Sequence, residues 1–162
     1  MKYIFLSEEF YKTYKENEYP EILHKPTRPY VMLMVKIDNL TFAIPIRSHL
    51  RHKFGFITNK ETNAGLDYSK AVIILKPEYI SDKQRITITR QEMLLISNSK
   101  ELIIKDFKRF LHTYKRKIKN NLSETLLKYS SLQYFHKELG LCYWCYPHIP
   151  LFTFIVFMLH YK

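Results

Sequence analysis

A 162-residue chain in which 46% of the residues are hydrophobic can bury the core of one domain, so these values exclude an intrinsically disordered protein. With 26 Lys and Arg against 15 Asp and Glu, the formal net charge of +11 predicts an anionic partner. Nucleic acid is the commonest such partner, and an anionic membrane, an acidic protein or an inert basic surface are the alternatives. The 3 glycines argue against a glycine-rich phosphate loop.

The first expected elements are a strand over residues 3–6 and a helix over residues 8–16. Ser7 is placed to cap this helix, and Glu8 and Glu9 follow it, where the helix dipole favours negative charge. The apolar run before Ser7 is too short for the core of a signal peptide. We therefore expect a cytoplasmic protein.

A β-hairpin is predicted over residues 30–46. Two nearly continuous apolar runs, 30–37 and 40–46, flank Asp38 and Asn39, a pair that tolerates the positive φ of a tight turn. Such runs are typical of central strands. Because Pro45 cannot donate a ladder hydrogen bond, we expect an edge or a bulge there, with the following residues leaving the sheet at its rim.

Three further strands are expected over residues 71–75, 85–89 and 93–96, and two helices follow them. Asn98 and Glu101 resemble a capping box that begins a long helix with an apolar face. A second helix is predicted over residues 123–139, ending at Gly140. This order of elements predicts an α+β fold, a compact antiparallel β-sheet with packed helices. We expect one domain over residues 1–140 and an apolar, aromatic tail over residues 141–162.

The segment from residue 47 to residue 53 is the most informative part of the sequence. It holds Arg47, Ser48, His49, Arg51, His52 and Lys53. A core strand does not tolerate this much charge, so the segment is expected to line a solvated surface or a cleft at the end of the hairpin.

These residue types suit metal-independent RNA cleavage. In that reaction the 2′-hydroxyl attacks the adjacent phosphorus, which needs a proton acceptor, a proton donor and cations around the charged phosphorane. His49 or His52 is suited to proton transfer, and arginine and lysine side chains to phosphate binding. The alternative is a basic rim that binds RNA without cutting it.

Two other groups are candidates for RNA contacts. Asp67, Tyr68 and Lys70 precede a predicted strand, where they form either part of the same rim or a plain turn. The polar face of the long helix is either an RNA-docking surface or a solvated face, and its cations include Lys105, Lys108, Arg109, Lys115 and Arg116. Cys142 and Cys145 form a lone C-x-x-C pair, and no carboxylate cluster has metal-binding spacing, so no metal or cofactor is expected.

The stretches RPYVMLMVKIDNLTFAIPIRSHLRHKFGF (28–56) and GLDYSKAVIIL (65–75) resemble the ToxN/AbiQ-like toxins of type III toxin–antitoxin systems, most closely the TenpIN and CptIN branches. A looser similarity continues to LQYFHKEL (132–139). The resemblance implies a strongly twisted antiparallel sheet and a metal-independent endoribonuclease that leaves a 2′,3′-cyclic phosphate. It also implies inhibition by a repeat-RNA pseudoknot antitoxin, which the toxin itself processes, within a closed toxin–RNA assembly that protects against phage by abortive infection.

The resemblance also assigns individual residues. Ser48 matches the active-site Ser or Thr that follows the hairpin, and Arg28 matches a basic residue before the hairpin that is lysine in many relatives. Arg47 replaces a threonine found in some members. Leu50 stands where relatives have a basic residue, so Arg51 or Lys53 is expected to supply that charge.

The C-terminal tail departs from the family pattern. Its apolar run, residues 149–159, is shorter than the ~20 residues that span a bilayer. We expect an appended segment without a part in the chemistry, cellular mRNA and antitoxin RNA as partners, and neither DNA nor a membrane. The rival hypotheses are a non-catalytic RNA-binding module and a toxin that perturbs membranes through this tail.

Overall fold

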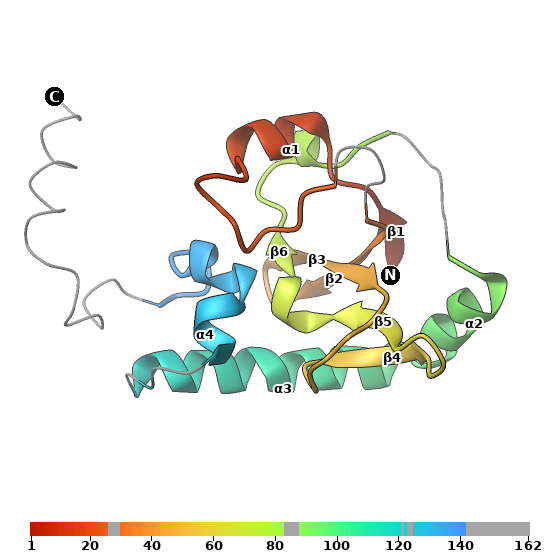
Figure 1. The fold of residues 1–162 in the computed structure, drawn as a ribbon. Helices are drawn as coiled ribbons and strands as arrows, with labels where there is room; N and C mark the ends of the chain where they lie inside the picture. The colour runs from red at the N-terminus through yellow and green to blue at the C-terminus, as the bar shows by residue number, and fades with distance from the viewer. Residues whose placement is uncertain (26–29, 83–87, 121, 123–124, 142–162) are drawn as a thin grey trace, which may run out of the picture.

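The computed structural model describes residues 1–25, 30–82, 88–120, 122 and 125–141, which form an α+β fold (Figure 1). The strands of its antiparallel sheet are β1 (Lys2–Ile4), β2 (Met32–Ile37), β3 (Leu40–Arg47), β4 (Gly55–Asn59), β5 (Ala64–Asp67) and β6 (Val72–Ile73). The α-helices are α1 (Glu8–Thr13), α2 (Arg90–Asn98), α3 (Lys100–Lys119) and α4 (Thr125–Tyr129). Three 3₁₀ turns complete the described elements, η1 (Tyr68–Lys70), η2 (Pro77–Tyr79) and η3 (Ser131–Phe135). The fold class predicted from the sequence is confirmed.

The predicted hairpin forms the centre of the sheet. Strands β2 and β3 pair from Met32↔Pro45 to Ile37↔Leu40, and Asp38 adopts the positive φ of 52° that the turn requires. The strand order is β1-β2-β3-β5-β4, and β6 also pairs with β3. Both hairpin strands therefore have neighbours on each side, as their apolar runs indicated.

The edge predicted at Pro45 is present only locally, because β3 is otherwise a central strand. On one side β3 pairs with β2, and on the other with β6 at Phe42 and Ala43 and then with β5 at Ile46 and Arg47. The Ile46 N–H donates to the Val31 carbonyl on the β2 side, so the Pro45 nitrogen points to the opposite side. There it faces the gap between β6 and β5, where no donor is needed.

The hairpin of β4 and β5 was not expected from the sequence. Two glycines allow its strands to approach closely: a Cβ atom at Gly65 would lie 2.1 Å from the Phe56 carbonyl oxygen, and one at Gly55 would lie 2.4 Å from that of Leu66. This hairpin matters because β5 delivers Asp67 to the end of β3.

Helix α3 lies against one side of the sheet (Figure 1) and buries a continuous apolar face that includes Phe107 and Tyr114, both fully buried. The predicted long helix is thus confirmed, with a polar opposite face, but it begins at Lys100. The predicted capping box of Asn98 and Glu101 is wrong, because Asn98 is the last residue of α2. The strand predicted over 93–96 is wrong, because these residues lie within α2. The capping box is formed by Thr89 and Glu92 at the start of α2, and Ser99 precedes α3 without a side-chain cap.

The helix predicted over 123–139 is broken into α4 and η3. At Ser130 the backbone is extended (φ −89°, ψ 133°), and its hydroxyl accepts a hydrogen bond from the Leu132 N–H. Gly140 does adopt the positive φ, 70°, that ends such a segment. Most of the strand predicted over 85–89, Arg28, both cysteines and residues 142–162 lie outside the described residues.

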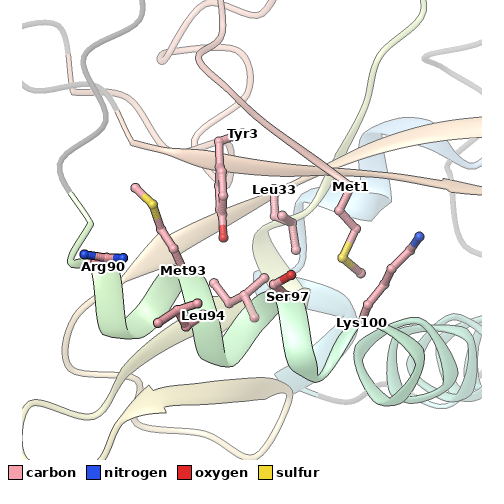
Figure 2. A pocket seen from close by; sticks show the side chains of 9 residues that line it. Met1, Tyr3, Leu33, Arg90, Met93, Leu94, Ser97 and Lys100 are labelled. Atoms are coloured by element: carbon pink, nitrogen blue, oxygen red, sulfur yellow. The ribbon is translucent and has the colours of Figure 1, made fainter.

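Helix α2 lies between the two terminal strands of the sheet, β1 and β4. On one side the Thr58 hydroxyl of β4 donates to Glu92 at 3.0 Å. On the other side α2 and β1 enclose an open groove of about 550 Å³, with Tyr3 and Leu33 facing Met93, Leu94 and Ser97 (Figure 2). Since one helix borders both ends of the strand order, the sheet curves around its core.

Candidate functional site

A buried carboxylate organises the charged residues at the end of β3. Asp67, the last residue of β5, is completely buried. One of its oxygens, Oδ1, accepts hydrogen bonds from the Ser69 N–H at 3.0 Å and the Ser69 hydroxyl at 2.6 Å. The other, Oδ2, lies 2.6 Å from Nη1 of Arg47. A buried negative charge therefore has partners on both oxygens.

Arg47 ends β3 and lies opposite Gly65 of β5. Its Nη1 atom binds Asp67, and the side chain as a whole is still 28% exposed. The planar fork of arginine carries five N–H donors, which lets it bind a carboxylate and a phosphate at the same time. The structure thus holds Arg47 as an oriented, partly exposed cation.

His52 lies beside the same carboxylate. Its Nε2 is 3.4 Å from Asp67 Oδ1 and 3.4 Å from the Ser69 hydroxyl oxygen. Its Nδ1 accepts a hydrogen bond from the Phe54 N–H at 3.2 Å. Arg47, His52, Asp67 and Ser69 together are called the Asp67 cluster below.

Residues 48–53, which follow Arg47 and include His52, form an exposed loop that is called the basic loop below. Only Leu50 of this loop is buried, at 7% exposure. The His49 N–H donates to the Thr62 carbonyl at 3.0 Å, and the Leu50 N–H donates to the Asn63 carbonyl at 2.9 Å. The loop is therefore anchored to the β4–β5 turn, while Ser48, His49, Arg51 and Lys53 face solvent.

Two serines that the sequence analysis did not single out support the backbone of the cluster. The Ser130 hydroxyl donates to the Ser69 carbonyl at 2.9 Å, and the Ser131 hydroxyl donates to the Ala71 carbonyl at 2.6 Å. Both serines are fully buried. Their spacing in the sequence carries no signal, because the contact joins segments about sixty residues apart.

The structure does not place every predicted RNA contact at the rim. Tyr68 is 3% exposed and packs against Phe107 and Phe110 of α3, so it belongs to the core. Burial and, to a smaller extent, Asp106 raise its pKa, which keeps the phenol neutral. Lys70 lies 2.5 Å from a carboxylate oxygen of Glu21 and also donates to the Glu21 carbonyl, so its charge is already paired. The sequence around residues 67–70 did not reveal these contacts, because the partners of Tyr68 and Lys70 lie on distant segments.

The cations of helix α3 lie on a different surface. Lys105, Lys108, Arg109 and Arg116 are exposed and Lys115 is partly exposed, on the face opposite the residues that pack on the sheet. They are called the helix cations below. The Asp67 cluster lies near the buried face of the same helix, because Phe54, whose N–H donates to His52, places its ring 5.8 Å from that of Phe110. RNA that touches both surfaces must pass around the helix.

The geometry of the site suits an anion with a reacting group beside it. The exposed edge of Arg47 and the charges of the basic loop supply cations, and Ser48 and His49 supply a hydroxyl and an imidazole next to them. In the described part of the chain, no three His, Cys, Asp or Glu side chains are arranged to hold a metal ion. Within those same residues, no helix is long and apolar enough to cross a membrane.

The chain matches no protein-family profile, no curated protein and no solved structure. The resemblance to the type III toxins therefore stays a prediction.

Proposed function

We propose that this protein is a metal-independent endoribonuclease whose site is the Asp67 cluster together with the basic loop. The observation that carries the proposal is the contact of Arg47 with the fully buried Asp67 at 2.6 Å, at the point where β3 leaves the sheet. A surface that only attracts RNA needs positive charge, but it does not need a buried counter-ion that fixes the direction of one arginine.

Each group has a defined chemical part in the proposal. Asp67 holds one edge of the Arg47 guanidinium, and the exposed edge binds the scissile phosphate and stabilises the charge of the phosphorane. The Ser48 hydroxyl, next in the chain and exposed, donates a hydrogen bond to a phosphate oxygen. Arg51 and Lys53 bind neighbouring phosphates. The 2′-oxygen attacks phosphorus, the bond to the 5′-oxygen breaks, and a 2′,3′-cyclic phosphate and a 5′-hydroxyl result.

The biological proposal is a cytoplasmic toxin that an RNA of short repeats inhibits. It is supported by the resemblance of residues 28–56 and 65–75 to the type III toxins and by the net charge of +11. In this proposal the toxin cuts its own repeat precursor and cellular mRNA, and toxin and RNA assemble into a closed complex. Arg28 would contribute to this site from outside the described residues.

The test is cleavage of a defined single-stranded RNA by purified protein in EDTA. We expect fragments with 2′,3′-cyclic phosphate and 5′-hydroxyl ends from wild type. Ser48→Ala is expected to cleave at least about tenfold more slowly while it binds the RNA as well as wild type does, because it loses one hydrogen bond to the phosphate.

The competing hypothesis is a non-catalytic RNA-binding module that uses the same surface. Tight, salt-dependent binding without any fragment from wild type would favour it over the nuclease. In cells, induced wild type is expected to arrest growth and fragment RNA, whereas Ser48→Ala is not. Deletion of residues 142–162 is expected to leave both effects in place, which would exclude membrane damage by the tail.

A further inference from the structure

The two histidines of the basic loop differ in what their imidazole nitrogens contact. We propose that His49, and not His52, transfers the proton during RNA cleavage, and that His52 is a positioning residue. This assignment rests on the proposed ribonuclease function and adds to it the identity of the proton-transfer group.

Both nitrogens of His52 have partners within the protein. A backbone N–H can only donate, so the bond from the Phe54 N–H places a lone pair on Nδ1 and the ring proton on Nε2. That proton points to Asp67 Oδ1 and the Ser69 oxygen, each 3.4 Å away. Since the Ser69 hydroxyl donates its own proton to Asp67 at 2.6 Å, its oxygen can accept from His52. His52 would have to break one of these contacts to exchange a proton with RNA.

His49 has no such contacts. Its side chain is exposed, and its ring makes no hydrogen bond, ion pair or ring contact in the described part of the chain. Both imidazole nitrogens are therefore available to a substrate, and neighbouring Ser48 and Arg47 bring a hydroxyl and an oriented cation to the same end of β3.

The backbone of His49 is held in a conformation that most residues avoid. Its φ is 59°, in the left-handed region, which residues with a Cβ atom rarely adopt. The other non-glycine residues with positive φ in the described chain, Asp38 and Asn63, are turn residues between paired strands. Two backbone hydrogen bonds, from His49 to Thr62 and from Leu50 to Asn63, fix this conformation. The Cα–Cβ bond of His49 thus leaves the loop in a defined direction.

The reaction step balances without a metal or a co-reactant. Neutral His49 accepts the proton of the 2′-hydroxyl while the 2′-oxygen forms its bond to phosphorus. The bond from phosphorus to the 5′-oxygen breaks, and the leaving oxygen takes a proton from water. The imidazolium then returns its proton to the solvent. The charged groups on the segment that carries His49 are Arg47, Arg51 and Lys53, and those on the β4–β5 turn to which its N–H is bonded are Lys60 and Glu61.

The experiment compares the pH dependence of cleavage by wild type, His49→Asn and His52→Asn. Asparagine tolerates the left-handed region, so His49→Asn keeps the backbone, and unfolding curves check that both variants fold. We expect His49→Asn to lower the rate about 10²–10⁴-fold and to lose the rise in rate near neutral pH. His52→Asn is expected to keep that rise with a smaller loss of rate. His112→Asn, on the exposed face of α3, is the matched control and should behave as wild type.

Chemical rescue gives a readout that a structural effect would not produce. Glycine accepts positive φ without strain, so His49→Gly keeps the loop and opens space where added imidazole can replace the side chain. We expect imidazole in the buffer to restore cleavage by His49→Gly but not by His52→Gly. If His49→Asn retains the rate and the pH-dependent rise while His52→Asn loses both, the assignment is wrong, although the nuclease proposal stands. If wild type itself does not cleave RNA, both proposals fail.

Discussion

The Asp67 cluster and the helix cations are both basic, but they hold their charges in opposite ways. At the end of β3, Arg47 is fixed by a fully buried carboxylate and only 28% of its side chain is exposed. On α3, Arg109 is 67% exposed and its partner, Asp106, lies one turn away on the same helix at 3.3 Å. A pair of the second kind contributes about 0.3–0.5 kcal/mol and leaves the cation free to reorient.

This difference separates two properties that net charge alone does not distinguish. Mobile, solvated cations raise the local concentration of RNA on any face that carries them. Catalysis needs a cation that is already oriented before the charge of the transition state develops. The two surfaces are therefore expected to respond differently to mutation, one in binding and the other in rate.

Loss of the buried carboxylate of Asp67 should have the largest effect, because it should lower both the stability and the cleavage rate. Asp67→Asn leaves Arg47 without its counter-ion and places an amide N–H₂ group where the carboxylate oxygens accepted hydrogen bonds. We expect the free energy of unfolding to fall by about 2–3 kcal/mol, as urea denaturation would measure, with cleavage at least about 10²-fold slower. Asp106→Asn is the control, and a stability loss as large as that of Asp67→Asn would remove the distinction between the two surfaces.

Arg47→Lys tests the orientation of the charge without changing its sign. Lysine keeps the positive charge but lacks the planar fork that binds Asp67 and a phosphate together. We expect a rate loss of about 10²-fold at saturating RNA with little change in RNA affinity, measured by cleavage and by fluorescence anisotropy. If RNA affinity fell about 10²-fold and the rate at saturating RNA did not change, Arg47 would contribute to RNA binding and not to catalysis.

Neutralising the helix cations should weaken RNA binding and leave the cleavage rate unchanged, which is the reverse of the effect expected for Arg47→Lys. Lys105→Gln, Lys108→Gln and Arg116→Gln combined remove up to three phosphate contacts on single-stranded RNA. The slope of log K against log salt should then become shallower by up to about 2, since each contact contributes about 0.7. The rate at saturating RNA is expected to stay within about twofold of wild type. An unchanged slope would mean that RNA does not reach this face of α3.

Removing the Tyr68 hydroxyl should be mildly favourable. This hydroxyl is buried without a hydrogen-bond partner among the described residues, although Tyr68 was a candidate for RNA contacts. Tyr68→Phe removes the unpaired polar atom, and we expect a gain of about 1 kcal/mol in the free energy of unfolding. RNA affinity should not change. Weaker RNA binding by Tyr68→Phe would place this side chain in the site after all.

The smallest expected effect concerns pH and lies away from both surfaces. Burial lowers the pKa of His136, whose Nε2 lies 2.8 Å from the Tyr114 hydroxyl. Because its pKa in the folded state is below the unfolded value of about 6.5, the unfolded chain binds the proton more readily. The stabilisation is thus complete above about pH 6.5 and is lost as the pH falls through the lowered pKa of the folded state.

His136→Gln removes this titration and keeps a polar partner for Tyr114. The urea midpoint of wild type should drop more than that of the variant when the pH falls from about 7.5 to about 5.5. This comparison also supplies the stability baseline for the pH–rate profiles of the histidine variants. Parallel curves for wild type and His136→Gln would contradict the burial argument.

The sequence revealed the elements whose signals are local. The hairpin follows from two apolar runs around Asp38, and α3 follows from apolar residues at helical spacing such as Phe107 and Tyr114. It did not reveal that residues 93–96 are helical, because a four-residue apolar run fits a strand or a buried helix equally well. The capping box of Thr89 and Glu92 begins a helix at this point, and its sequence pattern, Thr-x-x-Glu at residues 89–92, could have predicted that helix.

The site was predictable in composition but not in geometry. Residues 47–53 were singled out by their charge, and the structure gathers them at the end of β3. The pairing of Arg47 with Asp67 joins residues twenty positions apart through a β4–β5 hairpin whose main signals are Gly55 and Gly65. Without that hairpin the sequence could not show that Asp67 is buried or that the two loop histidines differ. The pairing of Lys70 with Glu21 was also hidden, because it joins residues 49 positions apart.

Ser130 and Ser131, which support the backbone of the Asp67 cluster, come about sixty residues after it in the chain. The carbonyls of Ser69 and Ala71 accept hydrogen bonds from Ser130 and Ser131. During synthesis the strands and the basic loop leave the ribosome well before these two hydroxyls do, since domains grow from the N-terminus. A nascent chain thus lacks part of the support beneath its own Asp67 cluster. The order of synthesis delays the fully supported site until nearly the whole described domain has emerged.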